Sequence, residues 1–174
     1  GLSNSYLLEK KFGWTGILAE PSEEYWPSLN SNRDSILDPR CVWSESGRQL
    51  LFLSSQELGS LEIVADRDLH RKVRSKNARK YMVNTVSLLD LLIEHQAPRH
   101  VDFLSIDTEG SEFEILSTFD FNSYSFGLIC VEHNFNEQRD KIRDLLRASG
   151  YDQARINAAD RRRLRRCGAV QRNP

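Results

Sequence analysis

The sequence lacks a hydrophobic run long enough to cross a bilayer. A transmembrane helix needs roughly 20 predominantly apolar residues, and no stretch of this chain approaches that length. The first residues also lack the basic segment and apolar stretch that are typical of a secretory signal. We therefore expect no membrane span and a cytoplasmic location.

Cysteine is scarce, with 3 residues, Cys41, Cys130 and Cys167. Their spacing matches no common metal-binding pattern. Cys41 and Cys130 lie inside apolar runs, where a reduced thiol behaves as a small hydrophobic side chain. We expect no disulfide.

Charge is distributed unevenly along the 174 residues. Up to Asp152 the chain has 17 Lys and Arg against 24 Asp and Glu, whereas from Gln153 onward it has 7 Arg against 1 Asp. The length suits one folding unit, and 39% hydrophobic with 28% charged residues is typical of a globular domain. The sequence predicts an acidic domain over 1–152 and a basic, disordered tail over 153–174.

Strand-like and helix-like segments alternate along the chain. Buried strands are predicted at 16–20, 101–107 and 126–131, and helices after Ser3 or Asn4, after Ser22, after Ser87, around Ile115 and over 137–149. The apolar stretches 50–53 and 61–64 indicate a hairpin-like insertion, and the strongly basic stretch 67–80 indicates a mobile surface loop. This alternation favours an α/β fold with a mainly parallel sheet.

Acidic residues follow three predicted strands at the point where each strand ends. Glu20 closes the first, the run 107–112 follows the second, and 132–134 closes the third. In α/β sheets, ligands bind outside the carboxyl ends of the strands. We therefore expect Glu20, Asp107 and Glu132 to lie at one edge of a single sheet and to line one cleft.

Glu20 has two interpretations. An acid that closes the second strand of a nucleotide-binding sheet is placed to accept hydrogen bonds from both ribose hydroxyls of a nucleoside cofactor. Glu20 has that position if a strand precedes Gly1. The alternative is that Glu20 only caps the helix that begins at Ser22, and the sequence leaves both interpretations open.

The acidic run crowds Asp107, Glu109 and Glu112 together. Burial there would raise their pKa values unless cations or hydrogen-bond donors compensate, so we favour a functional site over an exposed helix start. His133, beside Glu132, is a candidate base or metal ligand, although an isolated histidine is often a structural, hydrogen-bonded group.

Five segments, taken in order, resemble the FkbM methyltransferase family. They are SNSYLLE at 3–9, GILAEP at 16–21, SLLDLL at 87–92, DTEGSE at 107–112 and VEHN at 131–134. The resemblance runs from Gly1 to about Tyr151, and the Asp-x-Glu-Gly-x-Glu pattern is its most specific part.

The resemblance implies a Rossmann-like class I methyltransferase sheet, mainly parallel and in three layers, that binds S-adenosylmethionine and usually methylates an oxygen. Family members begin with a strand and a glycine-rich turn, and Gly1 resembles the last glycine of that turn. We therefore expect this chain to lack the first strand. Family members also add strands after the helix ending near Gly150, whereas 153–174 shows no strand pattern, so we expect an atypical tail.

The resemblance also implies roles for individual residues. Cofactor binding is assigned to Gly1, Ser3, Asn4, Glu20, Pro21 and Asp107. Methyl transfer from a sulfonium is an in-line displacement, so the enzyme must align the nucleophile and exclude water. An acceptor alcohol must also lose its proton, and Asp107, Glu109 and His133 are the candidate catalytic bases in that order.

A divalent cation held by Asp107, Glu132 and Asn134 is an alternative way to acidify the hydroxyl. It resembles metal-dependent catechol-type methyltransferases by position only, so we rank it below the metal-free route and expect no metal.

We expect O-methylation of a small-molecule or glycan hydroxyl. The alternative is a catalytically inactive, truncated methyltransferase-like domain that acts as a binding module. We do not expect nucleic-acid binding, because the body is acidic and no aromatic residues interleave with the terminal arginines. The sequence specifies no oligomeric state.

Overall fold

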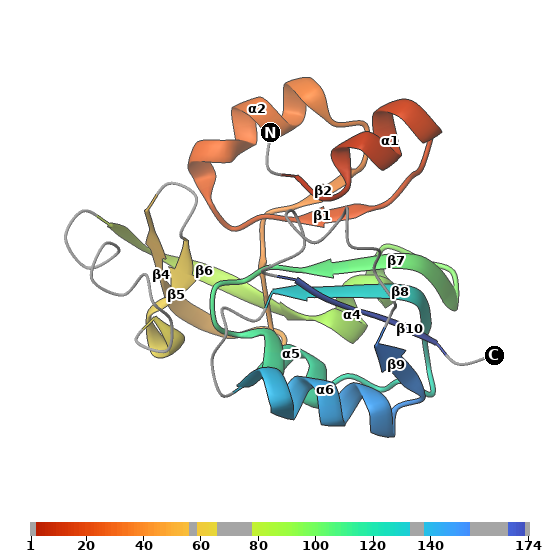
Figure 1. Cartoon of the computed structure of the whole chain (residues 1–174). Helices are drawn as coiled ribbons and strands as arrows, with labels where there is room; N and C mark the ends of the chain where they lie inside the picture. Colours follow the sequence, from red (N-terminus) through yellow and green to blue (C-terminus); the bar gives the residue numbers. More distant parts are fainter. Residues whose placement is uncertain (1–2, 56–58, 66–77, 133–137, 154–166, 173–174) are drawn as a thin grey trace.

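A computed structural model describes residues 3–55, 59–65, 78–132, 138–153 and 167–172. Its strands form three sheets (Figure 1). One sheet pairs β1 with β2, at Ile17–Ala19 and Ile36–Asp38. A second has the order β7-β8-β10-β9, at His100–Ile106, Ser125–Glu132, Cys167–Arg172 and Tyr151–Gln153. A third has the order β3-β6-β4-β5, at Cys41–Trp43, Arg79–Ser87, Gln49–Ser54 and Ser60–Leu61.

The pairing of these strands is mixed. Three pairs in the described ranges are parallel, namely β1 with β2, β3 with β6 and β7 with β8. Four pairs are antiparallel, because β10 runs against both β8 and β9, and β4 runs against both β5 and β6. The fold is therefore mixed α/β, and the described strands do not form the mainly parallel sheet that the sequence predicted.

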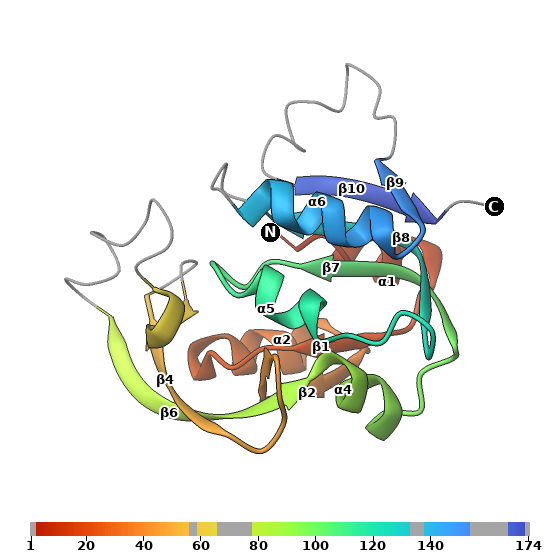
Figure 2. The same ribbon diagram turned by 90° about the horizontal axis from the view of Figure 1, so that it is seen from below.

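The helices lie on both sides of the central strands. The helical segments are α1 (Tyr6–Phe12), η1 (Glu23–Tyr25), α2 (Trp26–Asn32), η3 (Glu62–Val64), α4 (Leu88–Glu94), α5 (Glu112–Ser117) and α6 (Gln138–Ala148). In Figure 1, α1 and α2 lie above β1 and β7, and α5 and α6 lie below β8; seen from below in Figure 2, α5 and α6 are in front. No helix in the described ranges is long and apolar enough to span a membrane.

Local sequence signals account for α4. The hydroxyl of Ser87 accepts a hydrogen bond from the backbone N–H of Asp90 at 3.0 Å, which caps the first turn as expected. Leu88, Leu91 and Leu92 are buried, and they supply the inward face. The predicted helix is thus confirmed.

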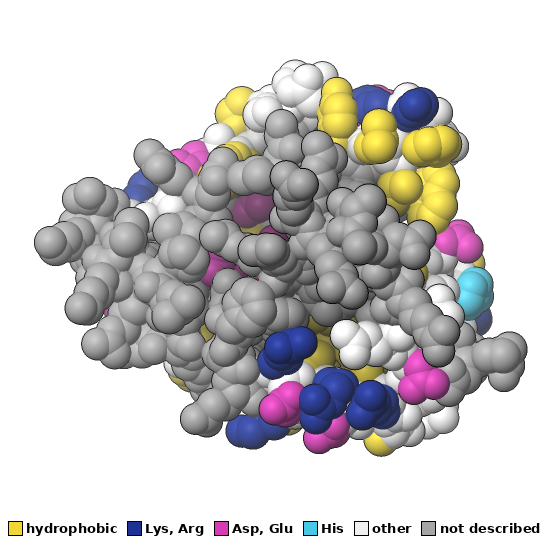
Figure 3. Space-filling model, in the orientation of Figure 1, with side chains coloured by type: hydrophobic (Ala, Val, Ile, Leu, Met, Phe, Trp, Pro, Cys, Tyr) yellow, Lys and Arg dark blue, Asp and Glu magenta, His cyan; other side chains and the backbone are white. Residues whose placement is uncertain are grey.

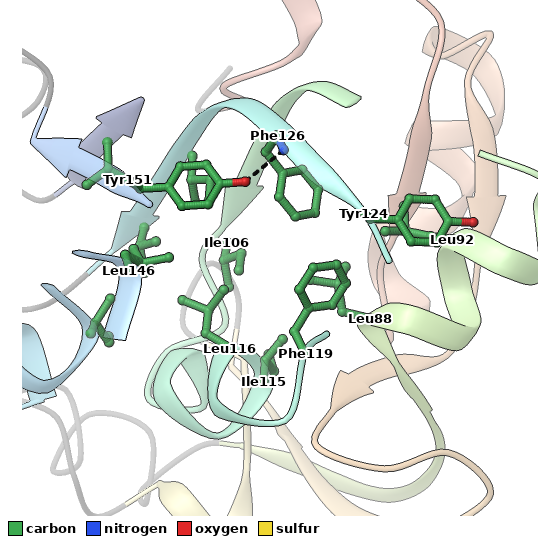
Figure 4. Packing of buried hydrophobic residues seen from close by; sticks show 14 residues of the cluster. Leu88, Leu92, Ile106, Ile115, Leu116, Phe119, Tyr124, Phe126, Leu146 and Tyr151 are labelled. Carbon is green, nitrogen blue, oxygen red and sulfur yellow. Dashed lines mark hydrogen bonds between the residues drawn. The ribbon is translucent and has the colours of Figure 1, made fainter. Parts of the chain in front are cut away.

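The main core lies around β8 and joins α4, α5, α6 and β9 (Figure 4). Phe126 and Ile129 of β8 are fully buried in it. The phenol oxygen of Tyr151, in β9, accepts a hydrogen bond from the backbone N–H of Phe126 at 2.9 Å. Tyr151 therefore fills the core and also provides a partner for a buried backbone donor.

The C-terminal residues join this core. We predicted that 153–174 packs little against the body, and this is wrong for the described part of that range. Gln153 pairs with Val170, which is buried, and β10 lies between β8 and β9. Main-chain pairing with two strands stabilises a segment that has few large apolar side chains. Residues 154–166 lie outside the described ranges.

The predicted hairpin is confirmed, since β4 and β5 are antiparallel with Phe52 opposite Leu61. The predicted basic loop over 67–80 is wrong at its end, because Arg79 and Lys80 belong to β6 and pair with β4. The remainder of that loop, up to residue 77, lies outside the described residues. A second cluster of buried apolar side chains, which includes Trp43 and Phe52, packs on the sheet β3-β6-β4-β5.

Candidate functional site

A cavity of about 230 Å³ lies where the ends of β1 and β7 meet the third sheet. Its acidic lining residues are Glu20, Asp107 and Glu109, and its apolar ones include Phe52 and Leu61. The predicted common cleft is thus confirmed for Glu20 and Asp107. Glu132 is not among the described residues that line it.

The expectation of a single sheet is wrong for the described residues. β1, which precedes Glu20, pairs with β2, whereas β7 and β8, which lead to Asp107 and Glu132, belong to a different sheet. The segment before α1 contacts β7, since the side-chain amide of Asn4 donates a hydrogen bond to the hydroxyl of Ser105 at 3.0 Å.

Glu20 is held in place on several sides. Its Oε1 accepts a hydrogen bond from the backbone N–H of Ser22 at 2.8 Å. Its own N–H donates to the Asp38 carbonyl, and its carbonyl accepts from the indole of Trp26, both at 2.9 Å. Burial raises the pKa of the Glu20 carboxyl. Glu20 therefore both orders the start of the next helical turn and presents a carboxylate to the cavity.

Ser22 precedes η1, but its side chain does not cap this helical turn. Its hydroxyl lies 3.0 Å from that of Ser54 instead, and Ser22 is buried. Glu20 accepts from the N–H of Ser22, and the hydroxyl of Ser22 joins this loop to β4 through Ser54.

The other predicted cofactor residues lie in different surroundings. Pro21 lines the cavity, and its carbonyl accepts from the phenol of Tyr81 at 3.2 Å. The hydroxyl of Ser3 accepts from Arg33 at 3.0 Å, and neither Ser3 nor Asn4 is among the described lining residues. Gly1 lies outside the described ranges.

The loop after β7 has a fixed shape. Glu112 is buried, and its carboxylate accepts from the N–H of Thr108 at 3.0 Å and from the N–H of Gly110 at 3.1 Å. Glu109 and Gly110 have positive φ values of 54° and 119°, and the hydroxyl of Ser60 donates to the Glu109 carbonyl at 2.9 Å. Glu112 therefore shapes the loop that carries Asp107 and Glu109.

Asp107, Glu109 and Glu132 form a compact acidic cluster. Each contributes a carboxylate oxygen, and these atoms lie within 4.8 Å of one another. Asp107 is exposed, whereas Glu109 and Glu132 are buried. Burial, the hydrogen bond and charge of Asp107, and the charges of Glu109 and Glu112 raise the pKa of Glu132 to about 9. Glu132 is therefore harder to ionise than an ordinary glutamate.

His133, the third candidate base, lies outside the described residues, and so does Asn134. Their proposed roles stay predictions.

Sequence reasoning did not single out the apolar wall of the cavity. Phe52 and Leu61 come from the hairpin, which the pattern marked only as an insertion. Cys41 also lines the cavity, and burial together with the charge of Glu20 raises the pKa of its thiol to about 12. The thiol is thus an unreactive part of the wall. No local pattern links these residues to Glu20, because their contact depends on how the sheets pack.

Comparison with known families matches residues 1–152 to the methyltransferase FkbM domain. No curated protein and no solved structure matches the chain. The matched range contains Glu20, the loop after β7 and Glu132. This chain therefore belongs to the FkbM methyltransferase domain family.

Proposed function

We propose that this protein is an S-adenosylmethionine-dependent methyltransferase that methylates a hydroxyl of a small-molecule or glycan acceptor. Membership of the family supports methyl transfer. The observation that carries the proposal is that Glu20 and Asp107, from the ends of two different strands, line one cavity. Carboxylates at strand ends are where this class of fold binds nucleosides and performs chemistry.

The lining residues fit a nucleoside cofactor. Glu20 presents a carboxylate that can accept from ribose hydroxyls, and the N–H of Ser22 orients it. Phe52 and Leu61 offer apolar surface suited to a flat base. The cavity of about 230 Å³ is smaller than the roughly 300–1,000 Å³ typical of ligand pockets, so it suits part of the cofactor. S-adenosylmethionine, when bound, supplies an activated methyl group.

The arrangement of the elements supports a Rossmann-like, three-layer fold as part of this proposal. β7 and β8 are parallel neighbours, and helices lie on both sides of them (Figures 1 and 2). Because the two strands are parallel, their ends at Ile106 and Glu132 lie at the same edge, which is where a doubly wound sheet places its ligand.

The catalytic work falls to the residues around the cavity. We infer that Asp107, which is exposed and lines the cavity, accepts the proton of the acceptor hydroxyl. The hydrogen bond between the carboxyl groups of Glu132 and Asp107 orients Asp107. Glu109 and His133 remain the second and third candidate bases.

Turnover is tested by incubating the protein with S-adenosylmethionine and a panel of hydroxyl compounds and measuring S-adenosylhomocysteine. We expect at least one acceptor to be methylated, and Asp107→Asn to lower kcat by about a hundredfold or more. Asp102→Asn removes the same charge from an exposed position of β7 and serves as the control. Binding of the cofactor without turnover on any acceptor would contradict the proposal and favour a non-catalytic binding module.

A further inference from the structure

We propose that Asp107, Glu109 and Glu132 bind a hard divalent cation, of the type of Ca²⁺, Mg²⁺ or Mn²⁺, beside the cavity. This goes beyond the proposed function, because the binding of a cation requires neither a cofactor nor an acceptor. It also reverses the sequence-based preference for a metal-free site, and it places Glu109 in the ligand set instead of Asn134.

The geometry matches the coordination of such ions. Two oxygen ligands of one ion lie at most twice the metal–oxygen distance apart, which is about 4.8 Å for Ca²⁺ and about 4.2 Å for Mg²⁺. The three carboxylate oxygens lie within 4.8 Å of one another. No pair of these oxygens is thus too far apart to share one Ca²⁺ ion, and Mg²⁺ or Mn²⁺ requires the oxygens to approach one another more closely. Asp107 can make that approach because its side chain is exposed.

Glu132 gives an independent indication of a missing partner. It is only 6% exposed, and its Oε2 is buried with no hydrogen-bond partner among the residues that the structure describes. The hydrogen bond that it does form is with Asp107, another acid of the cluster. Within the described ranges, no Lys or Arg forms an ion pair with Asp107 or Glu132. A buried acid without donors or cations is unfavourable, and a bound cation would supply the absent partner.

Glu112 shows what a satisfied buried acid looks like in the same loop. It is 4% exposed, and its carboxylate accepts from the N–H groups of Thr108 and Gly110 and from the hydroxyl of Thr108. Its donors account for its burial without any ion. Glu132 lies nearby and has no comparable donors in the described part of the chain. We therefore assign Glu132 as a ligand of the ion and Glu112 as a residue that shapes the loop.

Three carboxylates leave further coordination positions of such an ion for water or an acceptor oxygen. Since Asp107 and Glu109 also line the cavity, an ion here would lie next to a ligand bound in it. A hydroxyl bound to the ion would lose its proton more easily. This consequence for catalysis rests on the proposed function, whereas the binding itself does not.

The test is a titration of the full chain with Mn²⁺, after removal of metals with EDTA, in which free Mn²⁺ is measured by electron paramagnetic resonance. Ca²⁺ and Mg²⁺ are then added as competitors. We expect one saturable Mn²⁺ site from which Ca²⁺ displaces the ion. Asp107→Asn and Glu132→Gln should each weaken Mn²⁺ binding at least about tenfold, since each replaces a carboxyl group, which is ionised when it holds a cation, by a neutral amide. Asp102→Asn is the matched control and should bind like the wild type.

Absence of saturable Mn²⁺ binding, or equal affinity in Asp107→Asn and Asp102→Asn, would overturn the cation site. Asp107 is exposed, so its variant keeps the test decisive even where Glu132→Gln fails to fold. Binding of S-adenosylmethionine in EDTA is measured in parallel. A protein that binds the cofactor but no Mn²⁺ refutes the cation site alone, and one that binds Mn²⁺ but no cofactor refutes the proposed function alone.

Discussion

Both carboxylate oxygens of Glu112 lie 3.1 Å from the backbone nitrogen of Gly110. Gly110 has a φ of 119°, a region that side-chain-bearing residues rarely adopt, and a Cβ there would meet the Val64 carbonyl at 3.4 Å. Glu112 thus holds a turn that glycine allows and that directs Asp107 and Glu109 to the cavity.

Glu112→Ala is expected to lower the free energy of unfolding by about 2–3 kcal/mol, because it leaves buried N–H groups without their charged acceptor. Urea unfolding measures the change. Glu62→Ala, at a position whose side chain is half exposed, is the control and should stay within about 0.5 kcal/mol of the wild type. Equal stability of the two variants would show that Glu112 does not hold the loop.

The lowered pKa of Glu9 predicts a loss of stability in acid. Burial acts to raise the pKa of Glu9, but hydrogen bonds from Ser35, from the N–H of Asp34 and from Arg33, which lies 2.8 Å away, outweigh it and lower the pKa to about 2. Because the folded pKa is below the ordinary value of 4.5, the stabilisation is complete above that value and is lost as the pH falls towards 2.

Glu9→Gln should therefore be less stable than the wild type at neutral pH and should lose less stability between about pH 4.5 and pH 2. Chemical unfolding at a series of pH values gives the slope of unfolding free energy against pH for the variant and for the wild type. Glu45→Gln removes an acid whose side chain is 56% exposed, and its slope should match that of the wild type. A slope for Glu9→Gln equal to that of the wild type would contradict the assignment.

Tyr151→Phe tests the attachment of β9 to the core. The change removes only the hydroxyl that accepts from the N–H of Phe126, and it leaves that buried donor unpaired. We expect a loss of about 1–3 kcal/mol of unfolding free energy, as measured by urea denaturation. Tyr6→Phe, at a residue 46% exposed, should have little effect. An equally small effect at Tyr151 would mean that this hydrogen bond does not stabilise the fold.

Local patterns were sufficient for the elements whose signals lie within a few residues. The Ser87 cap and its leucines predicted α4. Gly13, which ends α1 with a φ of 69°, is a local signal of the same kind. The sequence could not predict, however, which face of α1 is buried. Leu7 and Phe12 are 59% and 60% exposed, and hydrophobic side chains gather on this part of the surface (Figure 3), while Glu9 is buried. Its partner Arg33 is distant in sequence.

The end of the chain shows a similar limit. The segment that forms β10 includes Gly168 and Ala169, so it lacks the large apolar alternation that marks a strand. Its pairing partners Val131 and Cys130 come from β8, and only they reveal it as a strand.

In the candidate site, the position of acids at strand ends was evident from the sequence, and Glu20 and Asp107 do share a cavity. The sequence could not assign separate roles to Glu112 and Glu132. Glu112 accepts hydrogen bonds from backbone N–H groups, whereas Glu132 lies against Asp107 and Glu109. This difference arises from the turn at Gly110 and from the packing of β7 beside β8.

Glu20 separates cofactor binding from a purely structural role. Glu20→Gln retains an oxygen that can accept from the N–H of Ser22, so the melting temperature without ligand should barely change. It removes the charge that strengthens hydrogen bonds from ribose hydroxyls. Glu23→Gln, at a side chain 61% exposed, is the matched control.

Isothermal titration calorimetry with S-adenosylmethionine compares the wild type, Glu20→Gln and Glu23→Gln. We predict that the wild type and Glu23→Gln bind with the same Kd, and that Glu20→Gln binds at least about tenfold more weakly, equivalent to about 1.4 kcal/mol. A wild type that does not bind, or a Glu20→Gln variant that binds as tightly as the wild type, would contradict the placement of the cofactor at Glu20.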